Sequence, residues 1–214
     1  MSLNTDLPFS EGLEALLNIQ KESGEKVRRQ QLVESMESNE AKGHDCLSCE
    51  GNCCTFQANS MKVTPLEALD LVVDMINKGR WTREWQSKLE DQVERDRLGD
   101  DLPTDGKRDL IRRTYTCPFF MVENSFGCAV ERWKKPYGCL AFNPKAPKQT
   151  EGGKCSSDIP SLEKQENDFS SLHKDTAEQL HQQLKIHNSK KDIPSAILEY
   201  MKILPTSGPG GSIS

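Results

Sequence analysis

The chain has 214 residues, of which 35% are hydrophobic and 29% are charged, and its formal net charge is −5 at neutral pH. This length suits one domain, and the composition predicts a modest core surrounded by solvated helices. The negative charge argues against a nucleic-acid partner. The chain starts without the basic and apolar segments of a secretory signal, and it has no run of about 18 apolar residues. We therefore expect a cytoplasmic protein that does not enter a membrane.

The first half of the chain predicts helices. Residues 10–40 have weak apolar periodicity, which indicates two helices broken near Ser23 and Gly24. The clearest helix covers residues 64–78, and it begins with the residues of a capping box. Thr64 is suited to the N-cap, Pro65 to the first helical position and Glu67 to the third.

A second helix is predicted to follow from Thr82. Its apolar positions recur every four residues, and they are Trp81, Trp85, Leu89 and Val93. This periodicity favours a role in the core for these side chains. Residues 99–106 are predicted to form a loop, and residues 107–113 a short helix.

The second half begins irregularly and then returns to helix. Residues 117–147 are rich in Gly, Pro, aromatic residues and Cys, and their pattern is neither helical nor alternating. Beyond Asp158 the apolar residues again follow one helical face, and Asp192 can cap a last helix. The final residues, 205–214, are rich in Gly, Pro and Ser.

These patterns predict a mainly α fold. In it, an irregular cysteine-rich metal-binding centre is packed between helices from the N- and C-terminal parts of the chain. The expected organisation is an N-terminal helical arm (1–43), a cysteine-cluster metal-binding domain (44–158) with a helical insertion (64–114), C-terminal helices packing on it (159–204) and a flexible tail (205–214).

The eight cysteines are the candidate functional residues. Cysteine clusters in a chain without an export signal are more often metal sites or catalytic thiols than disulfides. Thiolates are the soft ligands that zinc and iron–sulfur centres select. The candidate metal ligands are Cys46, Cys49, Cys53, Cys54, Cys117, Cys128, Cys139 and Cys155.

The first four cysteines form a C-x2-C-x3-C-C block. Two residues between cysteines let both sulfurs reach one ion around a tight turn. Adjacent side chains diverge, so we expect Cys53 and Cys54 to serve different ions or different edges of one cluster. In the looser second block, Pro118 follows a cysteine as it often does in iron–sulfur proteins, and Gly127 and Gly138 each precede one.

The charge around the second block has two interpretations. Residues 104–148 contain nine Lys or Arg and four Asp or Glu, a local excess of positive charge. Some of these cations could offset an anionic thiolate centre. The simpler interpretation is an ordinary solvated surface, because charge runs usually are one. The basic residues are Lys107, Arg108, Arg112, Arg113, Arg132, Lys134, Lys135, Lys145 and Lys148.

The order of these motifs resembles the YkgJ-type cysteine-cluster family, which is described as zinc- or iron-chelating. Family members have a CxxCxxCC block, then C-P-F, G-x-C and P-x-x-C segments and a last isolated cysteine. The matching segments here are 46–54, 117–119, 127–131, 135–144 and Cys155. The chain departs in having three residues before the cysteine pair and a long helical insertion after it. Over residues 44–158 the resemblance implies metal chelation by all eight cysteines, without implying a reaction.

Three functions remain open at this point. The first is a metal-binding protein with zinc or an iron–sulfur cluster as its cofactor, and with a protein partner that the sequence does not identify. The second is a thiol–disulfide redox protein that uses Cys46 and Cys49. The third is a nucleic-acid or protein interaction module with structural zinc, in which Tyr115, Trp133 and Tyr137 contact the partner. No phosphate loop or hydrolase motif occurs, so we favour a binding protein over an enzyme.

The four histidines add little to the metal prediction. His44 lies two residues before the first cysteine and is either an additional ligand or a loop residue. His173, His181 and His187 lack the four-residue spacing that places two ligands on one helical face. We expect these three at the surface or the edge of the core.

Overall fold

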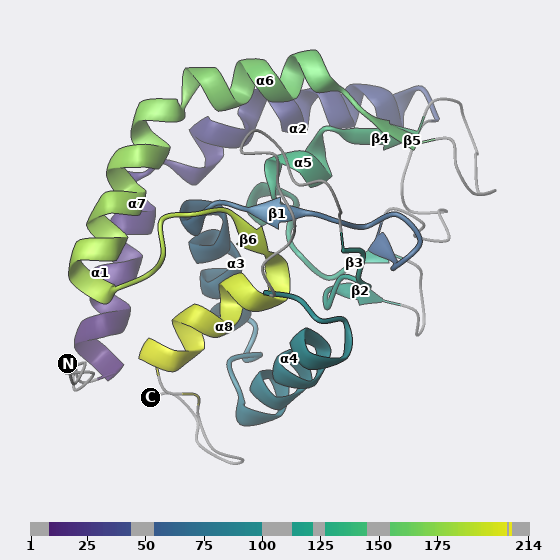
Figure 1. Cartoon of the computed structure of the whole chain (residues 1–214). Helices are drawn as coiled ribbons and strands as arrows, with labels where there is room; N and C mark the ends of the chain where they lie inside the picture. Colours follow the sequence, from purple (N-terminus) through teal and green to yellow (C-terminus); the bar gives the residue numbers. More distant parts are fainter. Residues whose placement is uncertain are drawn as a thin grey trace, which may run out of the picture.

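The computed structural model describes residues 9–43, 54–99, 113–121, 127–144, 155–204 and 206. Within this part of the chain the protein is mainly helical (Figure 1). The helices are α1 (Phe9–Glu22), α2 (Glu25–Ala41), α3 (Pro65–Asn77), α4 (Arg83–Arg95), the 3-10 helix η2 (Arg132–Lys134), α5 (Tyr137–Leu140), α6 (Ile159–Asp168), α7 (Ser170–Leu184) and α8 (Ile193–Ile203). None of these helices is both long enough and apolar enough to cross a bilayer.

Short antiparallel strand pairs connect the helices. The strands are β1 (Lys62–Val63), β2 (Phe120–Met121), β3 (Gly127–Cys128), β4 (Phe142–Pro144), β5 (Cys155–Ser157) and β6 (Lys191–Asp192). In the described residues they pair as β1 with β6, β2 with β3, and β4 with β5. Isolated pairs of this length are not stable in water, so packing or another interaction must hold them.

Helix α3 forms the centre of the main core. Its side chains Leu66, Leu69 and Leu71 are fully buried. Helices α1, α7 and α8 contact α3, and α4 packs across α8 (Figure 1). Trp81 is also fully buried, and its indole N–H donates to the Leu204 carbonyl over 3.3 Å. The core position predicted for Trp81 is thus confirmed.

A second, smaller cluster of buried side chains lies between α2, α5 and α6. Leu32, Val33 and Met36 of α2 meet Tyr137 and Leu140 of α5. Figure 1 shows α2 and α6 running alongside each other, with α5 next to them. This cluster attaches the N-terminal helices to the segment that carries the later cysteines.

The predicted helix ends are confirmed where the sequence provides caps. Gly24 separates α1 from α2 with a φ of 62°, a left-handed conformation that glycine adopts at little cost. At α3 the Thr64 side chain accepts from the Glu67 amide while Glu67 bonds back to Thr64, which completes the capping box. Arg113 is not helical, and the rest of the helix predicted at 107–113 lies outside the described residues.

Helix α8 also begins at its predicted cap. The Asp192 carboxylate accepts from the Ser195 amide over 2.9 Å.

We expect Asp192→Ala to lower the free energy of unfolding by about 1 kcal/mol, because an N-terminal amide of the helix loses its acceptor. Urea unfolding followed by circular dichroism measures this loss. Asp175→Ala, at an exposed position within α7, is the control and should stay within about 0.5 kcal/mol of the parent. Equal losses in both variants would contradict the capping role.

A fully buried ion-pair cluster joins α2 to α3. Arg28 Nη2 lies 2.9 Å and Arg29 Nη2 lies 2.7 Å from Asp70 Oδ2, and none of the three side chains is exposed. The Arg28 contact is also a hydrogen bond, whereas Arg29 Nη2 is not aimed at the oxygen. Burial opposes the charge of Arg28, but Asp70 and Tyr137 outweigh it and raise the pKa of the guanidinium. We call these three residues the Asp70 cluster.

Candidate metal centre

The structure describes five of the eight predicted ligands. Cys54, Cys117, Cys128 and Cys139 are half-buried, and the fifth, at position 155, begins β5. The other three predicted ligands, Cys46, Cys49 and Cys53, lie outside the described residues. The segments that carry the described cysteines are distant in the sequence, so the fold decides whether they meet.

The end of the first cysteine block lies beside the start of the second. The Cys117 amide donates to the Cys54 carbonyl over 2.7 Å, and the Tyr115 amide donates to the Asn59 carbonyl over 2.9 Å. The Phe56 amide donates to the Thr116 hydroxyl over 3.3 Å. Three hydrogen bonds therefore hold these two segments together.

Cys128 reaches the same region through the β2–β3 hairpin. It lies opposite Phe120 in the hairpin, and the Phe120 amide donates to the Cys117 carbonyl over 3.0 Å. Both Cys117 and Cys128 pack against the main core. In Figure 1 this hairpin is on the side of the molecule opposite α1 and α7.

Tyr115 connects Cys139 to this region. Its hydroxyl donates to the Met61 carbonyl over 2.6 Å and accepts from the Ile193 amide over 3.1 Å. Burial is the main reason that the pKa of Tyr115 is well above its usual range, and the negative charges of ionised Cys117 and Cys139 raise it further. Met61 makes the connection, because its carbonyl accepts from Tyr115 and its side chain lies against Gly138, the residue before Cys139.

Met61 also explains the glycine before Cys139. A Cβ atom at Gly138 would lie 2.6 Å from the Met61 sulfur, so the end of the flexible Met61 side chain would have to move to admit any other residue. Beyond α5, strand β4 pairs with β5, which places Pro144 opposite Cys155.

The described residues do not form a metal site by themselves. Among them, no three or more His, Cys, Asp or Glu side chains are grouped as metal ligands. The backbone brings together the segments that carry Cys54, Cys117 and Cys128.

A buried amide beside these segments is suited to a thiolate centre. Asn59 is 5% exposed, and its Oδ1 accepts from the Met61 amide over 3.1 Å, so Nδ2 is the group left as a donor. Nδ2 is buried and has no hydrogen-bond partner among the residues that the structure describes. A buried donor without an acceptor is costly, and a thiolate sulfur accepts such N–H groups in metal centres. The donor chemistry of this region therefore fits a thiolate-bound metal.

Cations from the α3–α4 turn lie against β3. Lys78 Nζ donates to the Ala129 carbonyl over 3.0 Å, and Arg80 Nη1 lies 3.5 Å from the same oxygen. Arg80 also lies over the ring of Trp85, which stacks on Phe119 with 5.9 Å between the centroids. Lys78 also pairs with Asp74 of α3 at 2.7 Å, so its charge is already balanced, and of these two cations Arg80 brings the positive charge near Cys128.

Two of the cations that the sequence singled out already have acidic partners. Arg132 pairs with Glu37 and Glu40 of α2, at 3.1 and 2.8 Å, and Lys134 pairs with Glu25. These pairs attach η2 to α2. Five others, Lys107, Arg108, Arg112, Lys145 and Lys148, lie outside the described residues.

The described histidines lie at the surface or at the core edge, as expected. His187 is 68% exposed, and His181 bonds to the Ile186 carbonyl over 2.9 Å. His173 is half-buried, and burial is the main reason that its pKa lies below the usual 6.5. His44 lies outside the described residues.

His173 lies in a chain of hydrogen bonds that runs from Tyr137 to Glu67. Burial also raises the pKa of Tyr137, although Arg28 opposes this, so both rings are neutral near pH 7. The Tyr137 hydroxyl accepts from Arg28, so its proton points to His173 Nε2 over 2.9 Å, and this leaves Nδ1–H to donate to the Thr64 hydroxyl over 3.1 Å. Thr64 in turn donates to Glu67 over 2.9 Å. No local pattern in the sequence indicates this connection, apart from the acidic residues within the apolar α3.

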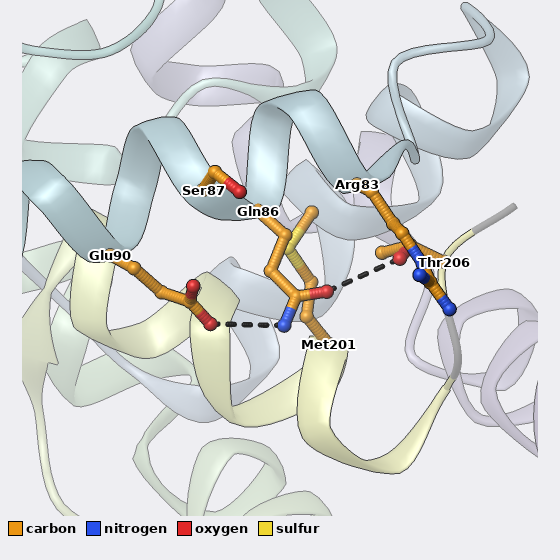
Figure 2. Close-up of a pocket in the computed structure, with 6 residues that line it drawn as sticks. All are labelled: Arg83, Gln86, Ser87, Glu90, Met201 and Thr206. Carbon is orange, nitrogen blue, oxygen red and sulfur yellow. Dashed lines mark hydrogen bonds between the residues drawn. The ribbon is translucent and has the colours of Figure 1, made fainter. Parts of the chain in front are cut away.

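An open hollow of about 360 Å³ lies elsewhere, between α4 and α8. Figure 2 shows Gln86 at its middle, bonded to Glu90 and to Thr206. Its lining contains none of the cysteines, and two of its polar side chains already satisfy Gln86. We assign it no role.

Comparison of the chain with protein-family models, curated proteins and solved structures gives no match. The resemblance to the YkgJ-type family therefore stays a prediction based on the order of the cysteines.

Proposed function

We propose that this protein binds zinc or an iron–sulfur cluster through its eight cysteines. Eight thiolates match two four-cysteine centres of either kind. A zinc centre would stabilise the fold, whereas an iron–sulfur centre would supply electron transfer or sensing. The proposed ligands are Cys46, Cys49, Cys53, Cys54, Cys117, Cys128, Cys139 and Cys155.

The observation that carries the proposal is the hydrogen bond between the Cys117 amide and the Cys54 carbonyl. Cys54 is the last cysteine of the first block and Cys117 the first of the second, so the two blocks meet at this bond. The unpartnered amide of Asn59 supports a thiolate acceptor nearby. Arg80 supports an anionic centre, because its guanidinium lies 3.5 Å from the carbonyl of Ala129, the residue after Cys128.

The test is anaerobic purification followed by metal analysis and a visible absorption spectrum of one sample. We expect either stoichiometric zinc in a colourless protein or iron with acid-labile sulfide in a brown one. The ratio of metal to chain distinguishes one centre from two. A sample that contains no metal and eight titratable thiols would overturn the proposal and favour the thiol–disulfide alternative.

A further inference from the structure

The turn that carries Cys139 is too short to hold its own shape. Helix α5 spans only Tyr137–Leu140, and an isolated helix of this length does not form in water. Its geometry must therefore come from contacts with other elements. Because Cys139 is part of this turn, those contacts also orient its sulfur.

Two helices hold the backbone just before Cys139. The Tyr137 amide donates to Glu67 Oε1 of α3 over 2.8 Å. Arg29 Nε of α2 donates to the Lys135 carbonyl over 2.8 Å. Both bonds are made by charged groups, which form the stronger class of hydrogen bonds.

Three side chains then hold the ring of Tyr137. Arg28 Nη1 donates to its hydroxyl over 3.0 Å, and the hydroxyl donates to His173 Nε2 over 2.9 Å. The Arg29 guanidinium lies 5.2 Å from the ring centroid. Tyr137 is 3% exposed, so water does not compete for these contacts.

From these contacts we infer that Arg28 and His173, acting through the Tyr137 hydroxyl, position Cys139 for metal binding. The inference rests on the proposed function and adds to it a set of positioning residues on α2 and α7, far from the cysteines in the sequence. Partners that orient a metal ligand strengthen the site because they remove wrong orientations.

Tyr137→Phe tests this role, since it removes one hydroxyl and keeps the ring. Tyr200→Phe is the matched control, because Tyr200 is also buried and its hydroxyl donates to the Pro65 carbonyl over 2.8 Å. The measurement is the rate at which a chelator removes metal from each purified protein under native conditions. We expect removal about 10-fold faster from the Tyr137 variant, the low end of the loss that follows when a group bonded directly to a metal ligand is removed. The control should stay near the parent rate.

The alternatives are distinguishable. A metal-free parent protein would overturn both the proposed function and this inference. A metal-loaded parent with equal removal rates in both variants would overturn the inference alone. If Tyr137→Phe does not fold, His173→Gln, at a half-buried position, takes its place with the same expected rate. In that case also, an unchanged rate would overturn the inference.

Discussion

Asp70→Asn is expected to lower the free energy of unfolding by about 3–5 kcal/mol, the usual cost of breaking a buried ion pair from one side. The substitution keeps the size of the side chain and removes its charge. Arg28 and Arg29 would then be buried without a counter-ion, since their other partners include the neutral carbonyls of Ser23 and Lys135. Neutral acceptors satisfy N–H groups but do not compensate two positive charges.

Urea unfolding at pH 7 measures this loss. Asp168→Asn is the control, because Asp168 pairs with Lys164 at 2.8 Å while both side chains remain about half exposed. An exposed pair contributes at most about 1 kcal/mol, so the control should unfold close to the parent. Similar midpoints for both variants would show that the Asp70 cluster contributes no more than a surface pair.

Cys117→Ser is expected to have the second large effect. Serine is a poor replacement for a thiolate ligand, so we expect the loss of one whole metal centre per chain. A structural zinc site supplies on the order of 10 kcal/mol of folding free energy in small domains, and losing it should weaken the parts that depend on it. The β2–β3 hairpin has two residues in each strand and is the first candidate.

Elemental analysis and hydrogen exchange measure the two effects together. We expect the amides of β2 and β3 to exchange faster in Cys117→Ser, while those of α3 stay protected by the main core. Thr116→Ala, one residue away, removes the acceptor of the Phe56 amide and should keep its metal. Full metal content in the serine variant would exclude Cys117 as a ligand.

The sequence predicted the helices best where a cap and an apolar stripe coincide. The first residues of α3 and α8 follow from Thr64, Pro65 and Asp192, because capping is a local interaction that a few residues determine. The break at Gly24 is also a local feature, because glycine adopts a left-handed conformation at little cost. The irregular segment after Cys117 was recognised as irregular, but its short strands depend on partners that no local pattern identifies.

The Asp70 cluster could not be predicted from these local signals. Asp70 bonds to Arg28 across 42 residues, and nothing near either residue indicates the other. Helix α2 has weak apolar periodicity because two of its buried positions are arginines. The candidate site has the same limit, since spacing identifies the eight cysteines but does not say which of them share an ion.

The Asp70 cluster has a consequence for how the protein can be divided. Helix α2 belongs to the N-terminal region that looks separable in the sequence, yet its arginines neutralise a carboxylate in the centre of the fold. Removing residues 1–43 would leave Asp70 as an uncompensated charge in an apolar core and would take away the support of Tyr137. A shortened chain made to test the proposed metal binding should therefore begin before α2, well upstream of the first cysteine.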